Sequence, residues 1–155
     1  MTDGFIGLTF ANDLITLLNG KWKSSGGAKP LFQTQWNIKN VGLGSRNYNQ
    51  VIISIDAENP QIYSLMQGDA TDATKFTYDW LHDVSISIDV RTSESESRVL
   101  QLVDEIMRIL KTNVVPTINN RTYIQMLPEG ITSLNEEYRN LYRYLISVSA
   151  IKLNP

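Results

Sequence analysis

The sequence contains no cysteine and a single histidine, His82. The absence of cysteine excludes disulfide bonds, catalysis by a thiolate and metal sites built from cysteine. There is no second histidine, and no group of acidic residues has the spacing of a calcium loop, so the sequence predicts no metal site. We therefore expect no bound metal and no other cofactor.

Long apolar runs and clusters of basic residues are also missing. No segment approaches the roughly 20 apolar residues of a membrane span. The N-terminal segment carries Asp3 and Asp13 and no basic leader, which makes it a poor secretory signal. The net charge is −2 and the pI is near 5.4, whereas a protein that grips nucleic acid needs a basic stripe to bind the phosphates. These absences argue against a membrane protein and against a nucleic-acid-binding protein.

The chain does have enough apolar residues for one ordinary domain. Its 155 residues are 42% hydrophobic and 19% charged, so it can bury a sizeable core. Apolar residues at helical spacing, followed by Gly20, predict a helix over residues 9–19. Segments rich in Gly, Ser, Asn or Asp predict loops at residues 23–30, 39–49 and 67–74.

Alternating side chains predict the strands. Residues 51–56 are rich in β-branched side chains and predict a strand that Asn59-Pro60 ends, and a shorter strand is expected at residues 32–36. Over residues 75–91 the apolar and aromatic side chains keep to even positions, with His82 among them. This run predicts either one long bent strand or two collinear strands with a bulge near residues 81–83.

A helix follows this strand directly. Ser93 stands three residues before Glu96, which is the spacing of a capping box, and Ser95 is a competing cap. Burying a large apolar side chain contributes roughly 1.5–3 kcal/mol, so packing of this helix against the sheet decides the fold. The helix is predicted over residues 95–111, and its apolar stripe consists of Val99, Leu102, Val103, Ile106, Ile109 and Leu110.

The C-terminal part of the sequence predicts strands at residues 122–127 and 141–153, with a turn at Pro128-Glu129-Gly130 after the first. Because the helices and strands are grouped, we expect an α+β fold. Its sheet is mostly antiparallel, with the helix at 95–111 packed across one face and the helix at 9–19 preceding the sheet. Without an internal repeat or a linker, residues 1–155 form a single domain.

The sequence offers little catalytic chemistry. His82 and Asp83 are neighbours in a predicted strand, so their side chains point to opposite faces and do not readily pair. The segment SSGGAKP lacks the Gly-Lys-Ser/Thr ending of a phosphate loop. We therefore expect that the protein is not an enzyme. A small enzyme or ligand-binding domain, with a pocket between sheet and helix, is the third alternative.

Aromatic residues gather on one face of the long strand, at Phe76, Tyr78 and Trp80. Such a face can stack on single-stranded bases, but no basic residues lie nearby in the sequence. This favours a core or a subunit interface, and Trp22 and Trp36 allow the same two interpretations.

Two segments resemble a known family. The stretch HDVSISIDVRTSESESRVLQLVDEIMRIL, residues 82–110, is similar to the central motif of tail terminator (tail completion) proteins of tailed bacterial and archaeal viruses. In that motif an alternating strand and a Ser/Glu-rich turn lead into a helix. The residues that match the helix are Leu102, Asp104, Glu105, Ile106 and Leu110. The segment YRYLISVSAI, residues 142–151, resembles the last strand of the family.

The resemblance implies a structural protein of the virion tail or neck that assembles in the host cytoplasm. Such proteins form a hexameric ring at the head-proximal end of the tail tube and end tube polymerisation. Expected partners are other copies of the chain, the tail tube protein and a head connector or neck protein, with genome DNA only as passing cargo and no membrane. Candidate ring-interface residues are Phe76, Tyr78, Trp80, Trp22 and Trp36. Candidate docking residues in loops are Ser25, Gly26, Gly27, Lys29, Arg46, Asp69 and Asp72.

The loops at residues 42–49 and 112–120 depart from the family pattern. The position of the ring in the neck therefore stays open, because a head-closure (stopper) protein or the sheath-capping terminator of a contractile tail would look similar. A second class also stays open: a non-viral α+β module that binds a protein partner through its sheet or its loops.

Overall fold

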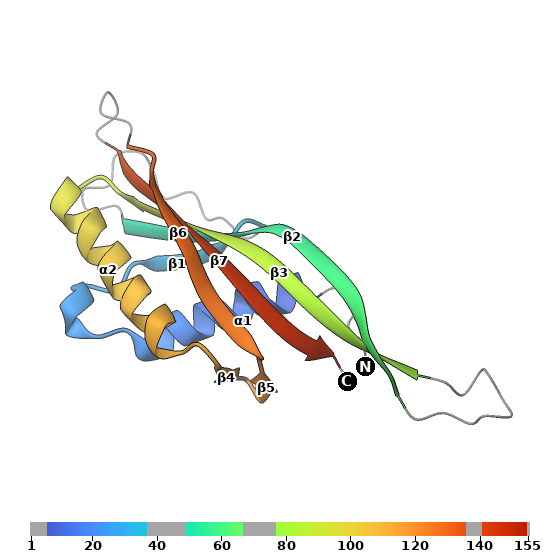
Figure 1. The fold of residues 1–155 in the computed structure, drawn as a ribbon. Coiled ribbons are helices and arrows are strands. Elements are labelled where there is room, and N and C mark those ends of the chain that lie inside the picture. Colours follow the sequence, from blue (N-terminus) through green and yellow to red (C-terminus); the bar gives the residue numbers. More distant parts are fainter. Residues whose placement is uncertain (1–5, 37–48, 67–76, 136–140, 155) are drawn as a thin grey trace, which may run out of the picture.

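The structure, a computed structural model, describes residues 6–36, 49–66, 77–135 and 141–154. In these residues it contains two long helices, a short 3₁₀ turn and seven strands (Figure 1). The helical elements are α1 (Gly7–Lys21), η1 (Ser24–Gly26) and α2 (Glu96–Thr112). The strands are β1 (Leu31–Thr34), β2 (Asn49–Met66), β3 (Thr77–Thr92), β4 (Thr117–Ile118), β5 (Arg121–Thr122), β6 (Gln125–Ser133) and β7 (Tyr142–Asn154).

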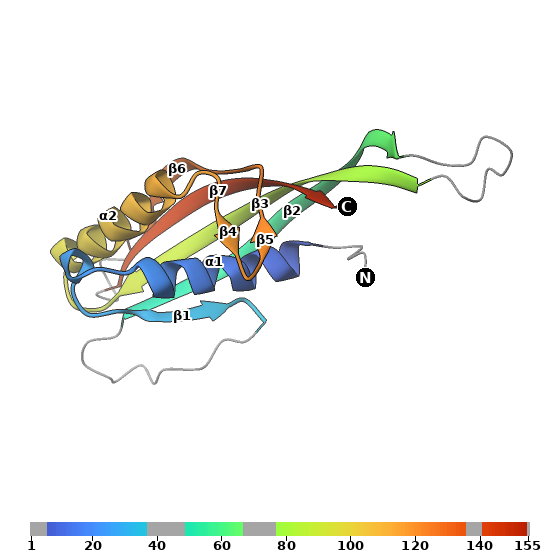
Figure 2. The ribbon, with the colours of Figure 1, turned by 90° about the horizontal axis from the view of Figure 1, so that it is seen from below.

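Five strands form one sheet in the order β1-β2-β3-β7-β6, and β4 and β5 form a separate hairpin. β1 runs parallel to β2, while the other neighbouring strands are antiparallel. Both long helices lie on the same side of the sheet (Figure 2). The predicted α+β fold, with a mostly antiparallel sheet and a helix across one face, is confirmed.

The core lies between the two helices and the helix-covered face of the sheet. In β3 the even-numbered positions from Val84 to Val90 are 0% exposed. The six apolar residues predicted to form the stripe of α2 are all buried there, and α1 adds Phe10, Ala11, Leu14, Leu17 and Leu18. At roughly 1.5–3 kcal/mol for each large apolar side chain, this contact dominates the stability of the fold.

The cap of α2 is Ser95. Its side-chain oxygen accepts a hydrogen bond from the Arg98 backbone N–H at 3.1 Å, and its own backbone is extended, as a capping residue requires. Glu96 is the first residue of α2, and its carboxylate oxygens accept from the Tyr144 hydroxyl at 2.8 Å and the Asn135 amide at 2.7 Å. The predicted boundaries of 95–111 therefore differ from those of α2 by one residue at each end.

β3 is one long strand without interruption. The irregularities lie in its partner β2, where register shifts separate Ile55 from Ala57 and Ile62 from Ser64. Each shift inserts one extra residue into β2 and bends it, while the alternation along β3 continues. Of the two alternatives that the sequence left open, the single bent strand is therefore correct, and the bulge predicted near residues 81–83 is wrong.

Two predicted strand ends are also wrong. β2 runs through Asn59 and Pro60, and β6 runs through Pro128 and Gly130 with a register shift between them. Both segments are at an edge of the sheet: β6 is the last strand, and β1 pairs only with residues 50–53 of β2. A proline lacks the backbone N–H that a central strand needs, but an edge strand does not require that donor. The two prolines therefore lie in edge segments of the sheet, and they do not end their strands.

A fully buried carboxylate ties α1 to the hairpin formed by β4 and β5. Asp13, which is 0% exposed, accepts hydrogen bonds from the Asn119 amide at 3.0 Å, from two nitrogens of Arg121 at 2.9 and 2.5 Å, and from the Tyr123 hydroxyl at 2.5 Å. Burial, followed by the hydrogen bond to Asp13, raises the pKa of Tyr123 above its ordinary value. The hairpin turn at Asn119 and Asn120 has positive φ at both residues, a conformation that asparagine tolerates.

Removing this carboxylate should strongly destabilise the protein. In Asp13→Ala, Arg121 and Tyr123 lose their buried acceptor, and we expect the free energy of unfolding to fall by about 3–5 kcal/mol. Chemical denaturation monitored by circular dichroism measures this loss. Asn12→Ala, at the exposed neighbouring position on α1, is the matched control and should change stability little. Equal stability of the two variants would contradict this role of Asp13.

Candidate functional site

The sheet face away from the helices is polar and is lined by hydroxyl groups. Five serines of the three central strands are neighbours in register there: Ser54, Ser85, Ser87, Ser147 and Ser149. Two acidic residues flank them, since Ser87 donates a hydrogen bond to Asp56, and Ser149 donates one to Asp83 at 3.4 Å. Around these serines the described side chains are hydroxyl and carboxylate groups, which do not bind a phosphate backbone as basic groups do.

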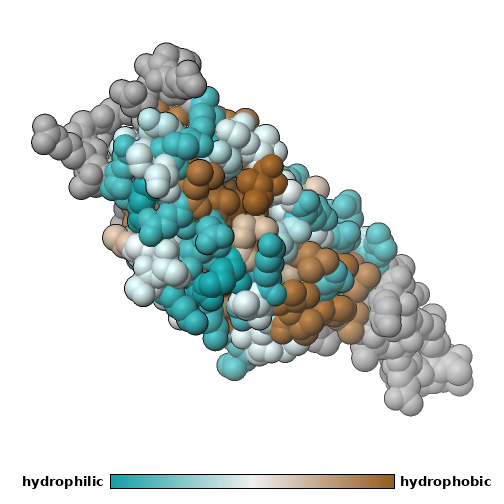
Figure 3. Space-filling model, turned by 60° about the vertical axis from the view of Figure 1, so that its left-hand side comes forward, coloured by the Kyte–Doolittle hydropathy of each residue, from teal (hydrophilic) through white to brown (hydrophobic). Residues whose placement is uncertain are grey.

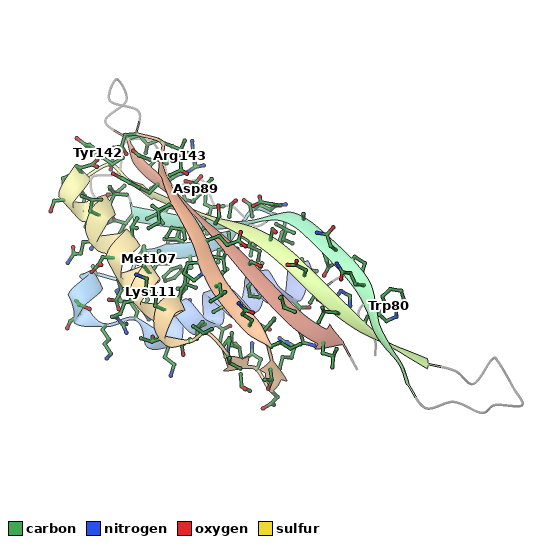
Figure 4. All side chains as sticks on the ribbon, in the orientation of Figure 1. Trp80, Asp89, Met107, Lys111, Tyr142 and Arg143 are labelled. Carbon is green, nitrogen blue, oxygen red and sulfur yellow. The ribbon has the colours of Figure 1, made fainter. Side chains whose placement is uncertain are left out.

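A charged cluster lies near the end of this face where Figure 4 labels Asp89 and Arg143. Asp89 accepts hydrogen bonds from Arg91 Nη2 at 2.6 Å and from Arg143 Nη2 at 2.8 Å, and the two arginines are directly opposite each other on β3 and β7. Burial raises the pKa of Asp89, but the hydrogen bonds from Arg143 and Arg91 outweigh it, so the pKa lies below its usual range.

The segment after α1, which contains four of the predicted docking residues, is fastened to α2. Glu105, which is 1% exposed, accepts hydrogen bonds from the Lys23 backbone N–H at 2.9 Å and the Ser25 hydroxyl at 2.8 Å. Arg108 donates to both oxygens of the same carboxylate, at 3.0 and 2.5 Å. Arg98 of α2 adds hydrogen bonds to the backbone oxygens of residues 26 and 28. The predicted loop at 23–30 is therefore confirmed apart from the 3₁₀ turn η1, but it is fastened to α2 by these hydrogen bonds.

Two glycines make this close approach possible. A Cβ atom at Gly26 would lie 2.6 Å from both Glu105 Cγ and the Trp22 ring, so the backbone can pack on α2 only without a side chain there. Gly27 has φ +69°, a conformation that favours glycine. The Trp22 indole N–H donates to the Gly27 carbonyl at 3.1 Å, and its ring packs edge-on against Phe32 at 5.7 Å. The composition of SSGGAKP is thus explained by close packing, which sequence reasoning took for flexibility.

The structure spreads the predicted aromatic residues over different environments. Trp80 is 39% exposed and Trp36 is 44% exposed, whereas Trp22 is partly buried against the core. Tyr78 belongs to β3 by its backbone. The predicted residues Phe76, Arg46, Asp69 and Asp72 lie outside the described residues. The structure therefore brings Ser25, Gly26, Gly27 and Trp22 together and places Trp80 on another part of the molecule.

His82 lies on the buried, helix-covered face of β3 and is 3% exposed. Its Nδ1 is 3.4 Å from Glu58 Oε1, and neither ring nitrogen makes a hydrogen bond in the structure. Asp83 is on the other face and accepts from Ser149, so the expectation that the two neighbours do not pair is confirmed. Among the described residues no group of three or more acidic or histidine side chains could hold a metal ion. No helix in the same residues is long and apolar enough to span a membrane.

The sequence patterns did not identify two carboxylates, those of Asp13 and Glu105, as buried and partnered groups. Asp13 interrupts the apolar positions of α1 between Phe10 and Leu17, which is a signal for a buried, partnered charge. Glu105 likewise falls between Leu102 and Ile109 on the buried side of α2. An acidic residue within an apolar helix face needs buried donors, but the sequence does not say which of the distant segments provides them.

The helices cover only part of the sheet, and β2 and β3 continue beyond them as a two-stranded arm (Figures 1 and 2). We define the arm as residues 60–66 and 77–82; residues 80–82 still pair with β7, and only the part of the arm past Trp80 is two-stranded. α1 begins at its base, where the Ile6 backbone N–H donates to Glu58 Oε1 at 2.8 Å. β7 pairs with β3 only up to Trp80, which Figure 4 shows on the arm, far from α2.

Exposed apolar residues are distributed over several elements. Figure 3 shows one face of the molecule, on which hydrophobic residues gather into separate patches with hydrophilic residues between them. The large hydrophobic residues with exposed side chains are Leu8, Leu31, Trp36, Trp80, Leu100, Val115, Ile124, Ile131 and Leu134.

The fold resembles that of a protein in a phage-like particle. Over 93% of this chain and 94% of the other, it matches a chain in a structure described as "Virion of native gene transfer agent (GTA) particle", with a TM-score of 0.54 and 12% sequence identity. At this identity the likeness concerns the fold. No protein-family model matches the sequence, and no curated protein matches it either.

The Glu105 cluster should make stability depend on pH in the acidic range. Hydrogen bonds from Arg108, Ser25 and the Lys23 backbone outweigh burial and lower the pKa of Glu105 to about 2 from 4.5. Because the pKa is lower in the folded chain, the stabilisation is fully present above about pH 4.5 and is lost as the pH falls toward 2. Unfolding free energies measured between pH 2 and pH 6 should show this loss in the unmodified protein.

The matched comparison uses two neighbouring positions of α2. Glu105→Gln should flatten the dependence of stability on pH, since the titrating group is gone. Asp104→Asn, at an exposed position, should keep the slope of the unmodified protein. If Glu105→Gln kept the same slope too, the cluster would not be the source of the acid sensitivity.

Gly26 and Gly20 give a second matched pair. Gly26→Ala forces a Cβ into contacts of 2.6 Å and should lower the free energy of unfolding by about 1–3 kcal/mol. A Cβ at Gly20, in the last turn of α1, meets nothing within 4 Å, so Gly20→Ala should be neutral or stabilise by up to about 1 kcal/mol. Thermal unfolding of both variants measures the difference. A Gly26→Ala protein as stable as Gly20→Ala would contradict the packing described for η1.

Proposed function

We propose that this chain is a structural virion protein of a tailed, phage-like particle. It forms a ring at the head-proximal end of the tail tube, ends tube polymerisation and joins the tail to the head connector. The observation that supports this most is the likeness of fold to a chain of the gene transfer agent virion, which extends over nearly the whole length of both chains. The protein acts by binding other proteins and catalyses no reaction.

The two segments that resemble tail terminator proteins are neighbours in the structure. Residues 82–110 form most of β3 and most of α2, and residues 142–151 lie in β7. The whole of β7 pairs with β3, from Trp80 to Thr92 of β3. α2 packs across the same strands. The resemblance therefore covers one contiguous unit of the fold, and this supports a common architecture over an accidental match of two separate motifs.

The surface chemistry of the chain suits a conduit through which DNA passes without being bound. The chain has a net charge of −2. The open sheet face carries serines flanked by Asp56 and Asp83, and the two arginines at its end, Arg91 and Arg143, are bound to Asp89. Basic residues neutralise phosphates and hold DNA, so a conduit for the genome benefits from their scarcity. Genome DNA is then cargo that moves through the ring.

Purified protein mixed with purified tail tubes tests the proposal. We expect negative-stain images to show rings on one end of the tubes, and capped tubes should no longer elongate when tube protein is added. A head-closure protein would instead bind the head connector and leave bare tube ends unoccupied. A chain that stays monomeric and ignores both tubes and connectors would contradict the proposal.

A further inference from the structure

The sequence contains one Asn-Gly pair, Asn19-Gly20, and the structure places it in the last turn of α1. Both residues are exposed, and a Cβ atom at Gly20 would meet no other atom within 4 Å. Asn19 uses its backbone carbonyl to accept a hydrogen bond from Lys29. Its side-chain amide is therefore at the surface, beside a backbone nitrogen that no side chain shields.

An Asn-Gly pair can convert its amide into an acid without an enzyme. The backbone nitrogen of Gly20 attacks Cγ of Asn19 and forms a new N–Cγ bond. The side-chain nitrogen takes up the proton of the attacking N–H and leaves as ammonia. Water then opens the cyclic succinimide at either of its carbonyl groups, which gives aspartate or isoaspartate. Glycine lacks the Cβ atom that hinders this attack in other residues.

The helix opposes this reaction as long as its last turn is closed. In an α-helix the N–H of Gly20 is bound to the carbonyl oxygen four residues earlier, so the attack requires that turn to open. Glycine weakens a helix, and helix ends open at little cost in free energy. α1 ends directly after this pair, since the backbone of Trp22 is already extended. The opening therefore involves only the end of the helix.

Twos cationic side chains hold the last turn closed. Lys29 Nζ donates to the Asn19 backbone oxygen at 2.9 Å, and Arg108 Nη2 donates to the Lys21 backbone oxygen at 2.9 Å. Arg108 also binds Glu105, so its position is fixed by α2. Lys29 is exposed and makes no such contact with a carboxylate among the described residues. Its hydrogen bond to Asn19 is thus the restraint that can be removed without disturbing the Glu105 cluster.

We propose that Asn19 is a site of non-enzymatic deamidation, and that Lys29 slows the reaction by holding the end of α1 closed. The product carries a new negative charge at the C-terminal end of the helix, where the helix dipole disfavours it. Isoaspartate also adds a carbon atom to the main chain and so loosens the connection between α1 and η1. This inference goes beyond the proposed function and does not depend on it.

Peptide mapping by mass spectrometry tests the site in the full-length chain. The purified protein is kept at mildly alkaline pH and sampled over time. Conversion at Asn19 should be about tenfold or more faster than at Asn12, an exposed residue of the same helix, because the side chain of Asp13 hinders the attack there. Conversion of Asn12 as fast as that of Asn19 would overturn the proposal.

Variants at two positions separate the roles of Gly20 and Lys29. Gly20→Ala has room for its Cβ atom and should slow conversion of Asn19 about tenfold or more, with native circular dichroism. Lys29→Met should speed conversion about two- to tenfold, the factor that corresponds to one hydrogen bond. Lys23→Met, at another exposed lysine, is the matched control and should leave the rate unchanged.

The two parts of the proposal fail separately. An unchanged rate in Gly20→Ala would overturn the assignment of the deamidation site. An unchanged rate in Lys29→Met, or an equal acceleration in Lys23→Met, would overturn the role of Lys29.

Discussion

The structure depends on the burial of one face of β3 beneath two helices. The even-numbered residues of that strand from Val84 to Val90 are 0% exposed, and the stripes of α1 and α2 are buried against them. The strand, however, is longer than the helices can cover. Past His82 the strand continues to Thr77, and Trp80 on it is 39% exposed. The arm is therefore a consequence of this mismatch in length between strand and helices.

Two buried carboxylates hold the helices and their connections in place. Asp13 binds α1 to the β4–β5 hairpin, and Glu105 binds α2 to η1. Each lies in an apolar helix face and is satisfied by arginine and by a hydroxyl group, which offsets the cost of burying its charge. The clusters are at different positions on the helix-covered side, and they leave the arm and the serine-lined face of the sheet free for contacts with other molecules.

The sequence predicted the unit formed by β3 and α2 well, because alternation and a helical stripe are local patterns that tertiary contacts reinforced here. It mistook Pro60 and Pro128 for strand ends, because whether a proline is tolerated depends on the neighbouring strand, which a local pattern does not show. It predicted the loop around Gly26 but not its attachment to α2, since the groups that fasten it, Glu105 and Arg98, are more than 70 residues away in the chain. The interface roles of Trp80 and Lys29 remain proposals, and their separation to opposite ends was visible only in three dimensions.

The central claim is that burial of one face of β3 beneath α1 and α2 holds the fold together. Hydrogen exchange of backbone amides along β3 measures this most directly. The account predicts slow exchange at residues 84–90, whose core face the helices cover, and exchange at least about tenfold faster at residues 77–79, which lie past the end of β7. Equal exchange rates in the two segments would contradict it.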